Sequence, residues 1–224
     1  MIFHATACVA WFLLHVLVAG VWRPALAARL GESGFRGLFS LLSALSLGVM
    51  IWTYLQAPTI WLWSPHPTLN VIAALLMLPA FILLVAGLRP GNPTLAGADL
   101  LLGDRLPVIG ITRVTRSPIL WAFALWAVAH MMANGDAATL LLAGTVLLTA
   151  LNGMVSIDRK KRRKLGEAYA AFERKTSVIP FAAILQGRNE FRFREIGWLT
   201  LIAGLLLYAA AFWLHGRLGT PIVL

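Results

Sequence analysis

Apolar residues along the chain fall into six continuous blocks and do not alternate with polar residues as they would in half-buried strands. A block of roughly 20 apolar residues is long enough to cross the hydrocarbon core of a bilayer as a helix. The pattern predicts six membrane-spanning helices, at about 2–22, 38–57, 69–88, 118–133, 137–155 and 196–214. No internal repeat or linker divides the chain, so residues 1–224 are predicted to form one all-α integral membrane domain.

The composition agrees with a membrane protein. Hydrophobic residues make up 59% of the chain and charged residues only 12%, about half the charged share of a soluble domain. In so apolar a chain, a net charge of +10 indicates loops beside anionic lipid headgroups and not a nucleic-acid partner. The single cysteine, Cys8, excludes an intramolecular disulfide and also covalent haem attachment through a Cys-x-x-Cys-His motif.

The distribution of basic residues predicts the orientation. Of the 19 Lys and Arg residues, only Arg217 lies outside the three loops that follow spans one, three and five. Loops rich in Lys and Arg stay on the cytoplasmic side of a membrane. Both termini are therefore expected on the opposite, periplasmic side.

Two of these loops have unusual sequences. Residues 87–118 form a long segment rich in Gly and Pro, which is expected to cap a membrane cavity, dip into the bilayer or form a plain loop. Residues 158–175 are strongly basic, and four of them lie at helical spacing: Leu165, Ala168, Tyr169 and Phe172. This second pattern predicts an interfacial helix lying on anionic lipid.

Histidines are the main ionisable groups inside the predicted spans, which contain no Asp, Glu, Lys or Arg. On the first span, steps of three and four residues connect His4, Cys8, Trp11, His15, Val18 and Trp22. On the fourth span, the same steps connect Ile119, Phe123, Trp126, His130 and Ala133. Such spacing keeps side chains on one helix face, so the two stripes, packed together, are expected to form an aromatic slot with imidazoles on both walls.

Three interpretations of these histidines compete. In the first they are structural, each bonded to a neighbouring carbonyl. In the second they hold zinc, which requires a third or fourth ligand at the same depth. Haem requires two imidazoles from different helices, an apolar slot and basic groups for the propionates. At 1.5 Å per residue, His15 lies about 10 Å and His130 about 18 Å from the cytoplasmic ends of their spans. These depths favour His15 with His130 as the pair, with His4 as the alternative to His15.

Several stretches resemble the NnrU family of bacterial membrane proteins: TRSPILWAFALWAVAHMMANGD (115–136), HVLVAGVWRPALAARLGESGFRGLFSLLS (15–43), GNPTLAG (91–97) and TSVIPFAAILQGR (176–188). The family is linked to denitrification, specifically to nitrite and nitric oxide metabolism. The resemblance implies a location in a bacterial inner membrane and a nitric oxide or nitrite reductase as a candidate partner.

NnrU proteins are in turn similar to the zeta-carotene isomerase of plants, a membrane enzyme that uses haem b with histidine axial ligands. Carried over by motif, this resemblance implies haem b as the cofactor and His15 and His130 as its ligands. Arg113 and Arg116, at the start of the fourth span, are candidates to pair with the propionates; solvated loop charges are the alternative. Ser117 stands where the family usually has a histidine, and Ala127 where the isomerase has a cysteine, so chemistry that depends on those two residues is not carried over.

The sequence thus predicts a haem-b-binding protein that supports nitrite or nitric oxide metabolism, or an isomerase-like redox reaction on a small or lipophilic ligand. A weaker resemblance to isoprenylcysteine carboxyl methyltransferases, in Gly166–Tyr169 and Ile179-Pro180, gives a second hypothesis. It predicts a membrane methyltransferase that acts on a lipid or small molecule at the cytoplasmic face. The third hypothesis is a non-catalytic partner of a reductase assembly, in which the histidines are structural.

Overall fold

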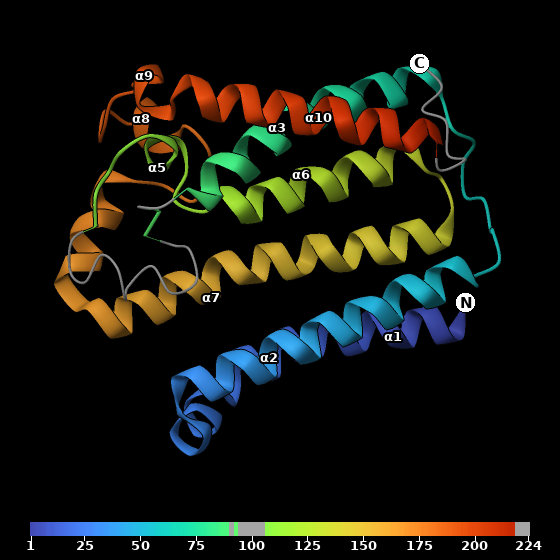
Figure 1. The fold of residues 1–224 in the computed structure, drawn as a ribbon, viewed down its shortest axis with the longest axis horizontal. Coiled ribbons are helices and arrows are strands. Elements are labelled where there is room, and N and C mark those ends of the chain that lie inside the picture. Colours follow the sequence, from blue (N-terminus) through green and yellow to red (C-terminus); the bar gives the residue numbers. More distant parts are fainter. Residues whose placement is uncertain (90–91, 94–105, 218–224) are drawn as a thin grey trace.

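The chain folds mainly into helices (Figure 1), in a computed structural model that describes residues 1–89, 92–93 and 106–217. In chain order the helices are α1 (Ile2–Leu13), the π-helix η1 (Leu14–Val21), α2 (Arg23–Leu55), α3 (Pro67–Leu88), α5 (Ile111–Val114), α6 (Pro118–Ala133), α7 (Ala137–Lys175), α8 (Ala182–Leu185), α9 (Phe193–Ile196) and α10 (Trp198–Arg217). The described part of the chain contains no strand, only a bridge between Trp61 and Asp136. The predicted all-α fold is confirmed.

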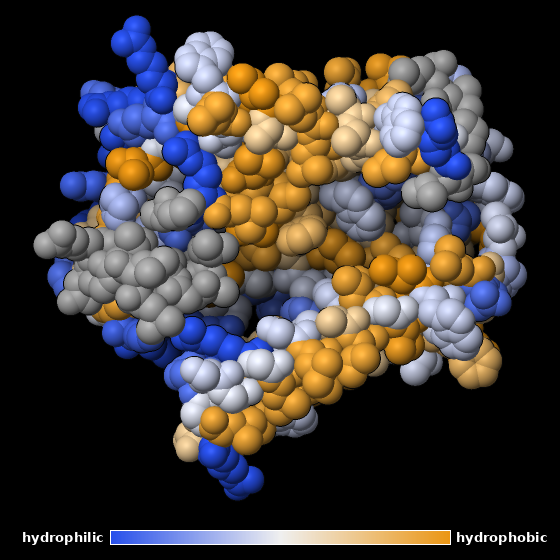
Figure 2. All heavy atoms as spheres, viewed as in Figure 1, coloured by the Kyte–Doolittle hydropathy of each residue, from blue (hydrophilic) through white to orange (hydrophobic). Residues whose placement is uncertain are grey.

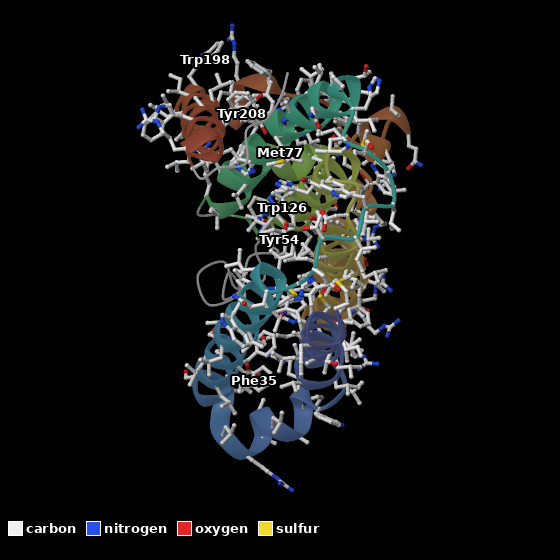
Figure 3. The ribbon with its side chains drawn as sticks, turned by 90° about the vertical axis from the view of Figure 1, so that its right-hand side faces the viewer. Phe35, Tyr54, Met77, Trp126, Trp198 and Tyr208 are labelled. Atoms are coloured by element: carbon white, nitrogen blue, oxygen red, sulfur yellow. The ribbon has the colours of Figure 1, made fainter. Side chains whose placement is uncertain are left out.

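The long helices stand side by side in the order α2, α1, α7, α6, α3 and α10. Figure 3, which looks along their axes, shows that this row curves into an open C with α2 and α10 at its two ends. Between those ends the surface is hollowed, as Figure 2 shows between the α1–α2 hairpin and the α3–α10 pair. The fold therefore builds a concave inner face from helices that are distant in sequence.

Five helical segments are long and apolar enough to cross a membrane: Ile2–Val21, Arg23–Leu55, Pro67–Leu88, Ala137–Lys175 and Trp198–Arg217. Helix α6 is apolar too, but its 16 residues span only about 24 Å at 1.5 Å per residue. This length is short of the roughly 30 Å hydrocarbon core. All six predicted spans are helical, and five of them reach spanning length.

Several helix boundaries differ from the predicted ones. Residues 23–37, expected as a loop, belong to α2, which starts with Pro24 in its first turn and bends at Gly31, where φ is 72°. Glycine adopts this positive φ without steric cost. The first span changes to a π-helix after Leu13, and Trp22 N–H donates to the Leu17 carbonyl, five residues back. The wider turn rotates Trp22 away from the stripe that the α-helical spacing predicts.

The predicted basic interfacial helix is not confirmed as a separate element. Residues 158–175 continue α7 and bend at Gly166, where φ is 51°. Beyond the bend the helix folds back, so that Arg162 pairs with Glu173 at 2.8 Å. Tyr169 and Phe172, expected to face lipid, are 0% and 2% exposed. This apolar face packs against the protein itself.

A buried polar network holds the folded-back segment in place. The Arg116 guanidinium donates to both carboxylate oxygens of Asp158, at 2.6 and 3.1 Å, and the Tyr169 hydroxyl donates to Asp158 at 2.7 Å. Burial, followed by the neighbouring Asp158 carboxylate, raises the pKa of Tyr169 far above its usual value. The phenol therefore stays protonated and remains a donor. Polar residues gather around this end of the bundle, on the left of Figure 2.

At the opposite end, the turn between α6 and α7 is locked to the segment before α3. Leu62 N–H donates to the Gly135 carbonyl at 2.7 Å. A Cβ atom on Gly135 would lie 1.9 Å from the Trp63 carbonyl oxygen, so only glycine permits this close approach. The Asp136 side chain then caps α7 by accepting from Thr139 N–H at 2.9 Å.

Candidate functional site: two tryptophan–histidine pairs

Apart from Trp22, the first-span stripe shares one helix face, as its spacing predicts, and that face lies in the angle between α2 and α7. His4 is 1% exposed, with Nδ1 3.2 Å from the Thr53 hydroxyl of α2 and Nε2 3.1 Å from the Ala138 carbonyl of α7. Cys8 packs between the same two helices. Because both ring nitrogens of His4 are occupied by protein partners, this residue has a structural role, and the alternative of His4 as an iron ligand finds no support in its geometry.

His15 presents a different arrangement. Its Nδ1–H donates to the Trp11 carbonyl at 2.9 Å; a carbonyl can only accept, so the proton is on Nδ1. The ring lies against the Trp11 indole, with centroids 4.3 Å apart, and meets Phe39 of α2 edge-on at 5.3 Å. Within the described residues Nε2 has no hydrogen-bond partner, which leaves its lone pair unused.

His130 on α6 repeats this geometry. Its Nδ1–H donates to the Trp126 carbonyl at 2.8 Å, and its ring lies 4.3 Å from the Trp126 indole. The same ring is 5.9 Å from His215 of α10. Its Nε2 also lacks a hydrogen-bond partner in the described ranges, so both histidines are held as the tautomer whose Nε2 can bind a metal.

Helix α7 gives a common measure of depth for the two pairs. Trp11 of α1 and Val146 of α7 pack against the same buried cluster around Cys8, and the Leu120 side chain of α6 comes within 3.3 Å of the Cβ position of Gly153. Trp126 lies six residues beyond Leu120, roughly 9 Å. Because α6 runs antiparallel to α7, Trp126 is therefore about level with Val146 too.

The imidazole rings converge on this level. Each ring folds back toward the N-terminus of its own helix, where its carbonyl partner lies one turn earlier. Helix α1 runs parallel to α7, since His4 contacts Ala138 and the Lys160 ammonium donates to the Ala19 carbonyl. Helices α1 and α6 thus run in opposite directions, and the ring of His15 and the ring of His130 are displaced toward each other in depth.

The sequence suggested that the two stripes pack directly against each other, but they do not. Helix α1 contacts α2 and α7, whereas α6 contacts α7 and α3. Figure 3 shows Trp126 on the inner side of the C, with Tyr54 of α2 across from it. The pairs therefore stand on two parts of one concave face, separated by the width of α7.

The two arginines proposed for propionates are both engaged with carboxylates. Arg113 forms a two-bond pair with Glu195, at 2.7 and 3.2 Å, and this hydrogen bonding holds the pKa of Glu195 below its usual range. Arg116 pairs with Asp158, and it also lies 3.5 Å from Glu173. Neither is a solvated loop charge.

Other features near the site were not predicted. Phe39 and His215 complete the surroundings of the two imidazoles, and neither lies on a predicted stripe. The repeated Trp-x-x-x-His spacing was a usable signal, because residues four apart on a helix are neighbours. Ser117, at the position of the family histidine, is 3% exposed, and its hydroxyl has no partner in the described part of the chain. In those same ranges no group of three or more His, Cys, Asp or Glu residues could hold a metal ion.

Comparison of the sequence with known proteins identifies the family of this chain. The family model described as NnrU protein matches residues 3–222. The chain belongs to the NnrU family. This match covers almost the whole chain, so both tryptophan–histidine pairs and the folded-back end of α7 lie within the matched residues.

Two curated relatives of this NnrU protein are chloroplastic 15-cis-zeta-carotene isomerases. The protein from Zea mays is 30% identical over 109 residues, and the one from Arabidopsis thaliana is 34% identical over 113 residues. In both cases the match covers 47% of this chain and 30% of the relative, so less than a third of each isomerase is represented. No solved structure matches the chain.

Proposed function

We propose that this NnrU protein binds one haem b on the concave face and that His15 and His130 would hold its iron. The observation that carries the proposal is that the two histidines have the same hydrogen-bonding pattern. Both donate Nδ1–H to a tryptophan carbonyl one turn earlier, and both leave Nε2 without a partner among the described residues. His4, by contrast, uses both nitrogens within the protein.

The residues around the two rings fit such a group. The indoles of Trp11 and Trp126 and the ring of Phe39 provide flat apolar surfaces beside the imidazoles. The backbone carbonyls hold each ring in one orientation and raise the basicity of Nε2. Bound haem would supply redox-active iron, suited to electron transfer or to binding a small molecule or a double bond.

The propionates require cations that the protein does not already neutralise. Arg113 and Arg116 remain candidates, but breaking a partly buried ion pair is costly, about 3–5 kcal/mol for fully buried pairs. Lys160 is better placed, since it lies beside η1 and bonds to the Ala19 carbonyl at 2.7 Å and to no carboxylate in the described ranges. We therefore add Lys160 to the two arginines as a propionate partner.

We further propose that α6 completes a set of six spans, with the basic end of the bundle in the cytoplasm of a bacterial cell and both termini periplasmic. Helix α6 packs between α3 and α7, two helices of spanning length, which shield it from lipid on both sides. Its shortness is then tolerated, because the residues at its ends contact protein and not the bilayer core.

For the reaction, we propose isomerase-like redox chemistry on a small or lipophilic ligand, supported by the similarity to the two carotene isomerases. A role in nitrite or nitric oxide metabolism remains the alternative within the same haem-binding proposal. In either case the chain would hold the iron ligands, exclude water and select the reactant.

The visible spectrum of the purified protein tests haem binding. Wild-type protein from haem-replete cells should show a Soret band, and the pyridine haemochrome assay should identify haem b at about one per chain. His15→Ala and His130→Ala should each lower haem content and change the band positions. His66→Gln, at an exposed histidine that caps α3, is the matched control and should keep the wild-type spectrum.

A colourless wild-type preparation would contradict the proposal and favour purely structural histidines. An unchanged spectrum in both alanine variants would contradict the ligand assignment alone, because haem would then be bound elsewhere.

A further inference from the structure

A cavity lies at the basic end of the bundle, apart from the concave face that carries the histidines. It has a volume of about 700 Å³ and lies between residues 106–113, the part of α7 beyond Gly166, and residues 187–192. Cavities of this size hold small molecules or the headgroups of larger ones. Its walls combine apolar side chains, among them Val108, Ala171 and Phe172, with several cations.

The cations of this cavity fall into two classes. Arg113 and Arg192 have carboxylate partners, Glu195 at 2.7 Å for the first and Glu190 at 3.1 Å for the second. Lys175 and Arg188 have no carboxylate partner among the described residues. Arg188 Nη1 donates only to backbone carbonyls at the end of α7, including that of Thr176 at 2.6 Å. The wall thus carries two positive charges that no acidic side chain balances.

An unused hydrogen-bond acceptor lies beside these charges. The Asn189 amide donates through Nδ2 to the backbone carbonyls of Lys175 and Arg113, at 2.5 and 3.3 Å. Two carbonyl partners fix the orientation of the amide, because a carbonyl can only accept. Asn189 Oδ1 is then buried without a partner in the described part of the chain, and a buried acceptor in this state is costly. A ligand that carries a donor would satisfy it.

We propose that this cavity binds a phosphate ester that bears a free hydroxyl. Lys175 and Arg188 would hold the phosphate through charge-assisted bonds, and the hydroxyl would donate to Asn189 Oδ1. The apolar wall would cover the carbon part of the ligand. A glycerol-type phospholipid headgroup and a soluble polyol phosphate share this chemistry, and neither depends on haem.

Binding can be measured on the full-length protein in a neutral detergent after removal of native lipid. The probes are short-chain phosphatidylglycerol, short-chain phosphatidylcholine and glycerol 3-phosphate, with thermal unfolding as the readout and native mass spectrometry for stoichiometry. We expect saturable binding of one phosphatidylglycerol and at least fivefold weaker binding of phosphatidylcholine. If glycerol 3-phosphate binds as tightly as the lipid, the ligand is a soluble phosphate ester, and the assignment of the phosphate site still holds.

Two variants separate the cavity from general surface charge. Lys175→Gln should weaken phosphatidylglycerol binding about fivefold, the effect of one cation near an anionic headgroup. Arg163→Gln removes the same charge from an exposed position outside the cavity and should stay within twofold of wild type. Ala171→Phe should block binding by filling the cavity while all charges remain.

Equal losses in Lys175→Gln and Arg163→Gln would overturn the proposal, as would equal binding of the two lipids or full binding by Ala171→Phe. Failure of either haem variant to alter the spectrum would leave this test unaffected.

Discussion

At the scale of single residues, the polar groups of this chain differ in whether all of their hydrogen-bonding atoms have partners. Those with every hydrogen-bonding atom engaged, such as His4 and Asp158, connect one helix to another. His15 and His130 each keep one ring nitrogen without a partner in the described ranges. An uncompensated polar atom inside a membrane protein usually marks a functional position, which is why these two imidazoles, and not His4, form the candidate site.

The bond from Tyr169 to Asp158 provides a residue-scale prediction. Tyr169→Phe should lower the free energy of unfolding by about 1.5–3 kcal/mol, the usual contribution of a hydrogen bond to a charged group. Denaturant or thermal unfolding in detergent measures the change. Tyr208→Phe is the control, since the Tyr208 hydroxyl has no hydrogen-bond partner in the described residues, and it should change stability by less than about 0.5 kcal/mol. An equal effect of the two variants would contradict the role given to the network.

Sequence spacing predicted the stripe residues His4, Cys8, Trp11 and His15 because side-chain direction in an α-helix depends on position alone. It did not predict the contacts of these residues with Phe39 and His215. Those contacts come from other helices, and spacing within one segment carries no information about which helices become neighbours.

At the scale of elements, the apolar blocks located the helices, and backbone irregularities changed their ends. Gly31 and Gly166 bend α2 and α7 without ending them, so the predicted loop at 23–37 is helical and the predicted interfacial helix at 158–175 continues α7. The π-helix that begins at Leu14 leaves no clear sequence signal, because its hydrogen bonds depend on tertiary packing. Lipid affinity was predicted for the apolar face of residues 158–175, but the bend at Gly166 turns that face inward.

The turn between α6 and α7 supports an element-scale prediction. Gly135→Ala should destabilise the protein by about 1–3 kcal/mol, the usual cost of forcing extra atoms into a packed site, because the new methyl group meets the Trp63 carbonyl. Gly144→Ala is the matched control, since nothing lies within 4 Å of its Cβ position. As a helical Gly-to-Ala change, it should stabilise α7 by up to about 1 kcal/mol. Thermal unfolding of both variants checks the pair; a neutral Gly135→Ala would show that the turn adapts.

At the scale of the whole molecule, charge and hydropathy divide the bundle into a basic end and an apolar body (Figure 2). The apolar blocks and the distribution of Lys and Arg along the sequence predicted this division. The sequence pattern did not predict the C-shaped arrangement. The order α2, α1, α7, α6, α3, α10 depends on packing preferences between whole helix faces.

Cysteine labelling tests the proposed orientation. The only native thiol, Cys8, is 2% exposed and should react slowly, so single added cysteines can be compared on the wild-type background. Ser64→Cys, between α2 and α3, should react with a membrane-impermeant maleimide in intact spheroplasts. Arg163→Cys, on the basic bend of α7, should react only after lysis. The reverse pattern would invert the topology and place the basic end outside.

If the proposed haem site is correct, the opening that the described helices leave between α2 and α10 would determine how reactants reach the imidazoles. If the bundle stands upright in a bilayer, that gap opens sideways onto the acyl chains and away from either aqueous phase. A carotenoid-like molecule, or an uncharged gas, would then arrive by lateral diffusion without crossing a water layer. A hydrated anion such as nitrite would first have to lose its hydration shell. The architecture would therefore select reactants by polarity before they contact the site.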